Sequence, residues 1–550
     1  MSNKVYLIIF LLSFCAPVRG QEARTQGKTP TGQPKFPVDT YFELPQHEKP
    51  IADEWSEVKG INVSWGDIDY RYAKHSIPMI VKSKDCKIRG WRGERVALQA
   101  VVWTASEMNL SYQLTDLKKG KSVIPSDDCE VGFVRYVMGD GLNSKGGGCG
   151  HRKDFTQFDS VMVADCIDPY LESVSLSPMS SQGIWVSCRI PRDVEPGKYI
   201  GYLNILDGDE CVDRLRLDLV VEDKILPDYK DWHFHLDLWQ NPFAVARYYQ
   251  VPLWSSAHFD AMRPIMERLA QAGQKVITAS IIDKPWNGQT EDAYSSMVTW
   301  IKRLDGTWEY KFDVFDAWVE FMISCGIDKQ IDCYSMVPWR LSFRYYDQAS
   351  DSFQELVSKP GDAQYEEHWL SMLSAFAAHL KEKGWFDICT IAMDERSMEI
   401  MKETIKVIRK ADKDFKIAFA GNYHPEIIDE IYDYSLAWNH TYPDGVIEKR
   451  RSQGMKSTYY TCCTEGKPNT FVFSDPTESF QLAFEMLSRN ADGYLRWAFN
   501  SWPLEPLLDA RFGTWSSGDT FLVYPGNRTS IRFERMIDGI EEYEKVKSFR

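Results

Sequence analysis

Hydrophobic positions follow two different periodicities along the chain. From about Trp55 to Val221, apolar and polar residues alternate in short runs that Gly and Pro separate. A period of two is typical of strands that bury one face, and frequent turns favour antiparallel pairing. The clearest runs span residues 95–105, 129–139, 183–191, 198–206 and 211–222. This region is therefore predicted to form an antiparallel β-sandwich.

After Trp232, strand-like apolar runs alternate with amphipathic helical patterns. The runs of strand length are 233–239, 275–283, 330–337, 387–395, 416–422, 434–441, 457–463 and 493–500. Apolar residues with helical spacing occupy 259–273, 312–326, 365–384, 398–412, 480–493 and 532–548. Gly273, Gly326, Gly384 and Gly493 fall at helix ends, where a glycine C-cap is expected. Eight strands, each followed by a helix, predict a (β/α)8 TIM barrel.

Together the two patterns predict a multidomain protein with a β part followed by an α/β part. The sandwich is expected to span residues 51–225 and the barrel residues 230–550, joined by the linker KILPDYKD. Residues 21–50 begin with a polar stretch that repeats Pro and Gly, and they are expected to form a flexible leader.

The first twenty residues are interpreted as a signal peptide. Lys4 precedes an apolar run from Val5 to Phe14, which is too short for a membrane span of about 20 residues. Cleavage is expected before Gln21, and the mature protein is expected in the periplasm or outside the cell. A lipid anchor at Cys15 is the alternative, although the bulky Phe14 before it is a poor match to that motif.

Composition narrows the possible partners. The chain has 550 residues, a net charge of -15 and 13% aromatic residues. An acidic surface argues against binding to nucleic acid or anionic membranes, and no later segment is apolar enough to span a membrane. Of the 12 cysteines, Cys15 lies in the signal peptide, which leaves an odd number. Disulfides in the first half of the chain and buried free thiols both remain possible.

The residues at the ends of the predicted barrel strands carry the candidate chemistry, because barrel active sites form at the C-terminal ends of the strands. Aromatic rings, amides and acids dominate there, a mixture that suits stacking on a sugar ring and hydrogen bonding to its hydroxyls. For any single aromatic residue, packing at the barrel rim is an equal alternative. The candidate ligand contacts are Trp239, Asn241, Asn422, Tyr423, Trp438, Asn439, Tyr442, Tyr460, Trp497 and Trp502, with Trp286 and Trp339 also near strand ends.

The sharpest feature is the acid pair Asp394-Glu395, which ends the fourth predicted strand. Taken alone, such a pair is readily explained as a cap of the helix that follows. At the end of a barrel strand, among aromatic and amide side chains, it instead favours catalysis. Paired carboxylates at a sugar site are the usual groups of glycoside hydrolysis.

A metal site is the competing interpretation. His233 and His235 form an HxH pair on the first barrel strand, but they lie at its start and therefore near the opposite face of the barrel. His424 and His440 alone do not make a metal site. We therefore expect no metal and no cofactor.

Several segments together resemble glycoside hydrolase family 123, a family of β-N-acetylgalactosaminidases. They are WRGERVALQAVV in the sandwich, MDE at the end of the fourth strand, GYLRWAFNSW and the C-terminal RFERMIDGIEEYE. The resemblance covers the chain from about Trp55 to its end. It implies that Asp394 and Glu395, which match the family's adjacent Asp-Glu pair, carry catalysis, and that the substrate is a glycan with terminal β-linked N-acetylgalactosamine.

The family also implies substrate-assisted catalysis, in which the 2-acetamido group of the sugar is the nucleophile. Adjacent acids suit this mechanism, because an ordinary retaining enzyme needs carboxyls about 5–5.5 Å apart on opposite sides of the sugar. Glu395 would be the acid and base, and Asp394 would orient the acetamide. Its carbonyl oxygen needs a tyrosine, for which Tyr460, Tyr442 and Tyr423 are candidates. A β-N-acetylglucosaminidase and a non-catalytic carbohydrate-binding protein remain alternatives.

Overall fold

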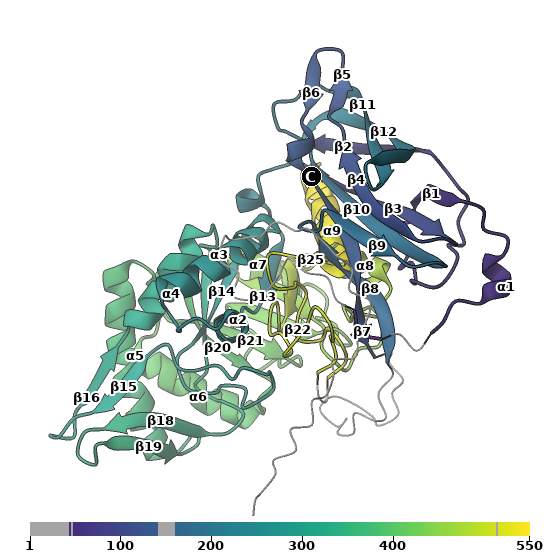
Figure 1. Cartoon of the computed structure of the whole chain (residues 1–550). Coiled ribbons are helices and arrows are strands. Elements are labelled where there is room, and N and C mark those ends of the chain that lie inside the picture. Colours follow the sequence, from purple (N-terminus) through teal and green to yellow (C-terminus); the bar gives the residue numbers. More distant parts are fainter. Residues whose placement is uncertain (1–42, 46–47, 141–159, 513–514, 550) are drawn as a thin grey trace, which may run out of the picture.

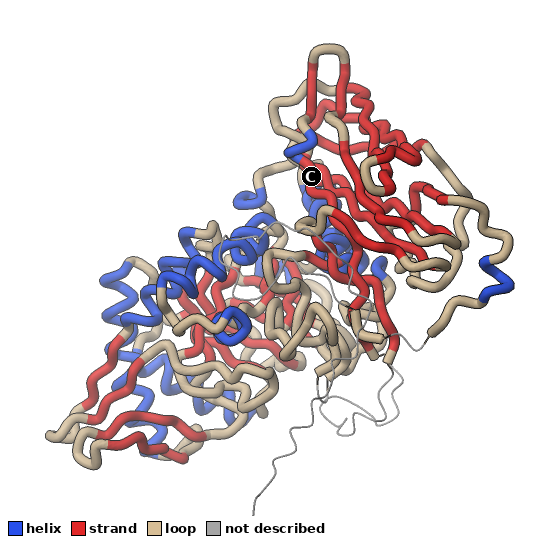
Figure 2. The backbone as a smooth tube through the Cα atoms, in the orientation of Figure 1, coloured by secondary structure: helices blue, strands red, loops and turns tan. Residues whose placement is uncertain are grey.

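The computed structural model describes residues 43–45, 48–140, 160–512 and 515–549. The predicted signal peptide and most of the predicted leader lie outside these residues. Figure 1 shows a β-rich N-terminal part and a larger part in which helices surround a sheet, and Figure 2 shows this change from mainly strands to mixed elements. The predicted order of a β domain followed by an α/β barrel is therefore confirmed.

The N-terminal part contains two sheets that enclose an apolar core. In spatial order, one sheet contains β1 (Ile61–Gly66), β3 (Arg95–Thr104), β10 (Ser180–Arg189), β7 (Cys129–Gly139), β8 (Val161–Asp168) and β25 (Thr529–Ser530). The other contains β2 (Asp85–Arg92), β12 (Glu210–Ile225), β11 (Gly197–Asp207), β4 (Met108–Leu114) and β9 (Ser173–Leu176), with β5 (Leu117–Lys119) and β6 (Ser122–Ile124) at its side. Among the described strands of these two sheets, neighbours pair antiparallel except β2 with β12, which are parallel.

The C-terminal part contains an eight-stranded parallel sheet. Its spatial order is β13 (His235–Leu238), β24 (Gly493–Arg496), β23 (Lys456–Tyr460), β22 (Asp433–Ala437), β21 (Lys416–Gly421), β20 (Cys389–Asp394), β17 (Gln330–Tyr334) and β14 (Val276–Ser280). Each of the predicted runs overlaps one of these strands to within one residue at its start or contains it whole. Three predicted glycine C-caps are also found, since Gly273, Gly326 and Gly384 all have positive φ. Gly493 instead begins β24, where a Cβ atom would lie 1.9 Å from the carbonyl oxygen of His235.

Helices cover the outside of the barrel. They are α2 (Pro242–Tyr249), α3 (Ser256–Gln271), α4 (Asp313–Ser324), α5 (Ala363–Lys383), α6 (Met398–Ala411), α7 (Val446–Ser452), α8 (Pro476–Ser488) and α9 (Ile531–Lys547). The chain before the barrel adds the short α1 (Ala52–Trp55). Between β21 and β22 the chain forms only turns, so the expectation of a helix after every strand is wrong at this one connection.

Side chains close the barrel between its first and second strands. β13 and β14 share only an isolated bridge between Leu236 and Gln274. The Gln274 side chain accepts a hydrogen bond from the Leu238 amide at 2.9 Å and donates to the Val276 carbonyl at 2.7 Å. Gln240 accepts from the Thr278 amide at 2.9 Å. These amide groups take the place of a backbone ladder and satisfy buried polar atoms of the backbone.

An additional four-stranded sheet, absent from the sequence prediction, is inserted after barrel strands β14 and β17. It consists of β16 (Trp308–Lys311), β15 (Thr299–Lys302), β18 (Ser342–Asp347) and β19 (Ser352–Val357), in spatial order. In Figure 1 it lies at the end of the molecule far from the sandwich. The loop that leads from β17 into this sheet carries Trp339 to the mouth of the barrel.

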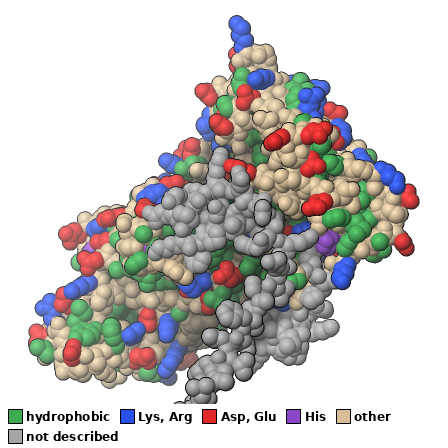
Figure 3. Space-filling view, viewed as in Figure 1, with side chains coloured by type: hydrophobic (Ala, Val, Ile, Leu, Met, Phe, Trp, Pro, Cys, Tyr) green, Lys and Arg blue, Asp and Glu red, His purple; other side chains and the backbone are tan. Residues whose placement is uncertain are grey.

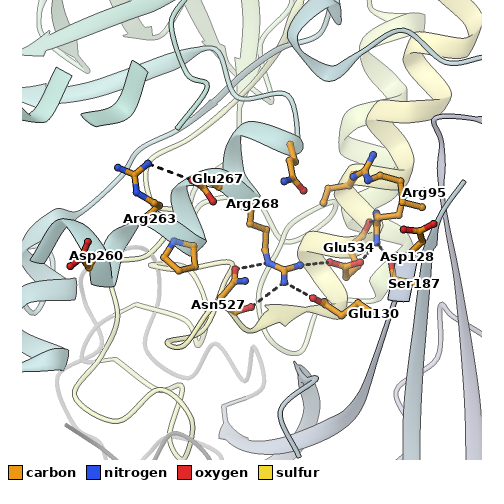
Figure 4. A pocket seen from close by; sticks show the side chains of 14 residues that line it. Arg95, Asp128, Glu130, Ser187, Asp260, Arg263, Glu267, Arg268, Asn527 and Glu534 are labelled. Atoms are coloured by element: carbon orange, nitrogen blue, oxygen red, sulfur yellow. Dashed lines mark hydrogen bonds and ion pairs between the residues drawn. The ribbon is translucent and has the colours of Figure 1, made fainter. Parts of the chain in front are cut away.

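The end of the chain joins the two parts. β25 pairs with β8 of the sandwich, and α9 packs along β3 and β8 (Figure 1). Fully buried ion pairs connect Arg532 with Asp165 at 2.9 Å and Arg528 with Asp168 at 2.7 Å. A polar cavity of about 600 Å³ lies at this junction (Figure 4). There Arg268 donates to Glu130 at 2.8 Å, so charged groups of the two parts pair with each other.

The described cysteines include both a disulfide-bonded residue and free thiols. Cys463 is disulfide-bonded, whereas the other described cysteines carry free thiols. Of the cysteines in the first half that could have formed disulfides, Cys149 lies outside the described residues, and Cys86, Cys129, Cys166, Cys188 and Cys211 are free.

None of the helices in the described part of the chain is long and apolar enough to cross a membrane. Charged side chains of both signs are scattered over the visible face in Figure 3.

Candidate active site

The acid pair lies where β20 ends at the mouth of the barrel. Asp394 is the last residue of the strand and is buried, with 8% of its surface exposed. Its Oδ2 accepts a hydrogen bond of 3.2 Å from the indole N–H of Trp339. Glu395 has φ +40, a left-handed conformation that is unfavourable for a residue with a side chain. This turn directs the two neighbouring carboxylates into different surroundings.

Glu395 is exposed and faces strand β23. The hydroxyl of Tyr460, the last residue of that strand, donates to Glu395 Oε1 at 2.8 Å. The amide of Glu395 also donates to the Ala420 carbonyl at 2.8 Å, which fixes its backbone to β21. Tyr460 is itself largely buried, and burial raises the pKa of its hydroxyl far above the ordinary value. The tyrosine therefore stays protonated and keeps its role as a donor.

The electrostatic environment of Asp394 is set mainly by burial. Loss of hydration raises its pKa to about 6, while the nearby positive charge of Arg396 and the N–H of Trp339 act in the opposite direction. Glu395, the adjacent acid, raises it further. Asp394 is therefore ionised at neutral pH but takes up a proton in mildly acidic solution. A carboxyl tuned in this way is typical of catalytic sites.

Aromatic rings form a wall beside the acid pair. Trp239 stacks on Trp286 with ring centroids 4.8 Å apart, and Tyr334 packs against both rings at 4.6 and 4.9 Å. Trp497 lines one small crevice together with Trp239 and Trp286. The indole N–H of Trp286 makes no hydrogen bond of normal geometry, although it acts on Asp394 and lowers its pKa.

Two predicted ligand contacts serve the fold instead. Trp502 is completely buried, and its indole N–H donates to the Val523 carbonyl at 2.7 Å. Asn241 is also buried and caps α2, since its Oδ1 accepts from the amides of Phe243 and Ala244. Neither side chain offers a free polar group to a ligand at the barrel mouth.

Trp438 and Tyr442 lie on the outer side of the barrel sheet. Tyr460 points toward Glu395 inside, so its neighbour Tyr459 points outward. Trp438 and Tyr442 pack against Tyr459 at 6.1 and 5.5 Å. With Asn439 they line a separate cavity of about 710 Å³. The structure therefore does not bring them to the acid pair, because the strand ends turn them toward the helix layer.

The remaining predicted residues lie on neighbouring loops. Asn439 is exposed, and its amide approaches Glu465 Oε1 at 3.4 Å. Asn422, which is exposed, and half-buried Tyr423 follow β21, and the Tyr423 ring contacts Tyr442 with centroids 6.2 Å apart. Of the predicted contacts, Tyr460 is hydrogen-bonded to the acid pair, and Trp239 and Trp497 belong to the aromatic wall.

Sequence reasoning missed Tyr334 and Arg396. Tyr334 is the last residue of β17, so a strict search of strand ends would have found it. Arg396 directly follows the acid pair and donates through Nε to the Val337 carbonyl at 2.8 Å. The sequence shows that Arg396 is next to the acid pair. It does not show the contact with the loop after β17, because that contact depends on the left-handed turn at Glu395.

The two histidines of the HxH pair do not share a partner. The Nδ1 atom of His233 lies 3.0 Å from Glu544 Oε2. His235 Nε2 lies 2.8 Å from Asp433 Oδ2 inside the barrel. In the described residues, no group of three or more His, Cys, Asp or Glu side chains is arranged to hold a metal ion.

Comparison with known proteins shows the family to which the chain belongs. Residues 239–549 match the model of the glycoside hydrolase 123 catalytic domain, and residues 65–207 match that of the glycoside hydrolase 123 N-terminal domain. The chain therefore belongs to glycoside hydrolase family 123 and is a glycoside hydrolase. No match was found among functionally curated proteins.

Solved structures extend the likeness to the whole fold. A family 123 glycoside hydrolase from Clostridium perfringens, whose structural analysis addressed glycolipid glycan hydrolysis, superposes with a TM-score of 0.81. The two chains are 26% identical over 89% of this chain and 88% of the other. A GH5 xyloglucanase from Bacteroides ovatus also matches, at 8% identity over 83% of this chain and 98% of the other, but its TM-score is 0.29.

Proposed function

We propose that this protein is a retaining, exo-acting glycoside hydrolase that releases terminal β-linked N-acetylgalactosamine from glycans by substrate-assisted catalysis. The observation that carries the proposal is the contrast between two adjacent carboxylates. Asp394 is buried beneath an indole N–H, whereas Glu395 is exposed and accepts from Tyr460. Environments that differ in this way give two acids different roles.

In the proposed first step, Glu395 protonates the glycosidic oxygen as its bond to C1 breaks. The carbonyl oxygen of the substrate's 2-acetamido group forms the new bond to C1, and Asp394 accepts the hydrogen bond of the acetamide N–H. An oxazolinium ion results, and its N–H stays hydrogen-bonded to the Asp394 carboxylate. In the second step Glu395 removes a proton from water, which attacks C1 and opens the oxazolinium ring with net retention. Neighbouring residues on one strand end suit this mechanism, because they cannot flank the sugar from opposite sides.

Among the three candidate tyrosines, Tyr460 is the one we assign to the acetamide oxygen. Its hydroxyl already lies at the acid pair. Tyr442 donates to the Tyr434 carbonyl at 2.6 Å within the packed layer outside the barrel. Tyr423 contacts Tyr442 rather than the acids. The wall of Trp239 and Trp286 is the surface we assign to the apolar face of the sugar ring.

Two further parts of the proposal rest on other grounds. The preference for N-acetylgalactosamine follows from the resemblance to the family. Hydrolysis of glycolipid glycans by the similar Clostridium perfringens enzyme supports a glycoconjugate substrate. Export to the periplasm or the cell exterior follows from the signal-peptide pattern of residues 1–20.

The proposal is tested with aryl β-glycosides of N-acetylgalactosamine, N-acetylglucosamine and galactose. We expect release of the aryl group from the N-acetylgalactosaminide and no comparable rate with the galactoside, which lacks the nucleophile. A thiazoline mimic of the intermediate should inhibit strongly, because a site shaped for the reaction binds such a bicyclic analogue tightly.

Each alternative has its own outcome in this panel. Cleavage of the galactoside at a comparable rate would refute the acetamide mechanism. Faster cleavage of the N-acetylglucosaminide would reassign the sugar while keeping the mechanism. Binding of the acetamido sugars without any turnover would favour a carbohydrate-binding protein on this scaffold.

A further inference from the structure

Arg396 connects the acid pair to the loop that follows β17. Its Nε donates to the Val337 carbonyl at 2.8 Å, and its guanidinium lies over the ring of Trp339 at 5.4 Å from the centroid. Trp339 in turn donates its indole N–H to Asp394 at 3.2 Å. Trp339 therefore contacts both Asp394 and Arg396, which are two residues apart in the chain.

The indole needs such an anchor. Trp339 is 43% exposed, so packing alone holds its ring on one side only. Its backbone is fixed at one point, where its amide donates to the Pro285 carbonyl at 3.0 Å. A half-exposed side chain on a loop loses conformational freedom when it is held in one rotamer. Arg396, stacked on the ring and bonded to Val337 of the same loop, limits that freedom.

The left-handed turn at Glu395 makes this arrangement possible. With φ +40 at Glu395, consecutive side chains diverge: Asp394 lies in the barrel mouth, Glu395 faces β23, and Arg396 reaches back to the loop after β17. No ion pair within 4.0 Å is found for Arg396 in the described residues, and its Nη2 is buried without a hydrogen bond. Arg396 therefore contacts the loop after β17 through a backbone hydrogen bond and an aromatic ring and not through a salt bridge.

We propose that Arg396 is a positioning residue, which ties the loop after β17 to the acid pair and thereby holds the Trp339 indole N–H on Asp394. The proposal deepens the proposed function, on which it rests for its kinetic readout. It assigns to Arg396 no contact with the sugar. Its effect passes to the reaction through the ionisation and orientation of Asp394.

The groups that act on Asp394 determine the expected direction. Glu395 and Arg396 belong to its own segment, Trp339 and Trp286 to loops, and burial is the largest influence on its pKa. Tyr334, on β17, feels the charge of Asp394 and is kept neutral chiefly by burial. Arg396 is thus the only cation among these groups. Its removal takes away both a nearby positive charge and the support of an N–H donor, and each loss raises the pKa of Asp394.

The test compares Arg396→Gln with Arg396→Lys and with the control Arg340→Gln, a neighbour of Trp339 whose side chain is 73% exposed. The first readout is the pH dependence of kcat/KM for the aryl glycoside, whose acid limb reports the base form of the free enzyme. We expect Arg396→Gln to move this limb upward by about one pH unit. Arg396→Lys, which keeps the charge, should recover part of the shift, and Arg340→Gln should match the wild type.

The second readout is amide hydrogen exchange of peptides that cover residues 336–341, which does not depend on turnover. We expect faster exchange in Arg396→Gln and unchanged exchange in Arg340→Gln. If the wild-type enzyme cleaves no glycoside, the proposed function fails, while the exchange data still decide whether Arg396 anchors this loop. Unchanged exchange in Arg396→Gln would overturn the anchor, and an unchanged acid limb in an active variant would overturn its effect on Asp394.

Trp339→Phe provides an independent variant if Arg396→Gln does not fold. Phenylalanine keeps an aromatic ring for Arg396 but removes the N–H donor. We expect the acid limb to rise while exchange of the loop stays at the wild-type rate. A limb that stays in place would show that the indole N–H does not transmit the effect, and the proposal would then be wrong.

Discussion

The ionised carboxyl of Asp394 destabilises the folded protein. Burial raises its pKa from the ordinary 3.8 to about 6, so the folded state binds this proton more tightly than the unfolded chain does. The free energy of unfolding therefore falls as the pH rises from 3.8 to about 6, and the cost is fully present above that range. A rise of about two pH units corresponds to about 3 kcal/mol.

We predict that Asp394→Asn abolishes most activity but stabilises the protein above pH 6. Asparagine keeps an acceptor for the Trp339 N–H and carries no charge. The expected gain is about 1–3 kcal/mol at pH 8 and none at pH 4, because the wild-type carboxyl is protonated in acid. Thermal unfolding at both pH values provides the measurement. Glu395→Gln is the matched control, since Glu395 is exposed, and an equal gain in both variants would contradict the explanation.

The two acids are also predicted to respond differently to the leaving group. Glu395→Gln removes the proton donor, so its cost should be about 10²–10⁴-fold for an oligosaccharide and much smaller for the first step with an activated aryl glycoside. Asp394→Asn removes the charge that stabilises the forming oxazolinium ion, a step that every substrate shares, so its cost should vary little. Single-turnover kinetics with several aglycones measure both effects. The opposite order would exchange the assigned roles.

Individual residues also show where sequence reasoning ends. The acid pair is predictable from its place at the end of a barrel strand among aromatic and amide strand ends, because taken alone it could equally cap the helix that follows. Amides and aromatics at strand ends have several: Asn241 caps a helix, and Trp502 fills the core. Their sequence signals do not differ from those of Trp239, which lies in the aromatic wall. Only the direction of each side chain separates these cases, and the sequence does not give that direction.

At the scale of elements, the closure of the barrel depends on side chains. We predict that Gln274→Leu lowers the free energy of unfolding by about 1–3 kcal/mol, because it leaves the buried amide of Leu238 without a partner and removes one of the two hydrogen bonds to the Val276 carbonyl. Gln271→Leu, at the exposed end of α3, should change it by less than about 0.5 kcal/mol. Denaturant titration of both variants measures the difference, and equal effects would contradict a role of Gln274 in closure.

The strand pattern was predictable because each barrel strand is a buried apolar run bounded by turns. The inserted sheet was not, since β15 and β16 have only four residues each and β15 pairs with β18 from a different loop. The connection after β21 also departs from the pattern, because it forms turns and no helix. The insertion matters for function, since the loop from β17 to β18 carries Trp339.

At the scale of the whole molecule, sandwich and barrel are connected by the C-terminal segment rather than by the linker alone. Arg532 and Arg528 are buried at the junction, and their charges are neutralised by Asp165 and Asp168 of β8. Removing either partner would leave a buried charge, which is strongly destabilising. The sandwich is therefore part of the structural support of the catalytic barrel, a relationship that no local sequence pattern announces.

The pairing of β25 with β8 also sets the order in which the molecule can be completed. The sandwich is synthesised first, and domains generally begin to fold as the chain emerges from the ribosome. Yet Cys166 and Ile167 of β8 pair with Ser530 and Thr529, which follow the whole barrel sheet in the sequence. Until β25 has been made, this strand edge stays open to other chains. A nascent chain that stalls within the barrel would therefore expose an unpaired strand edge of the sandwich, although the sandwich strands themselves were already complete.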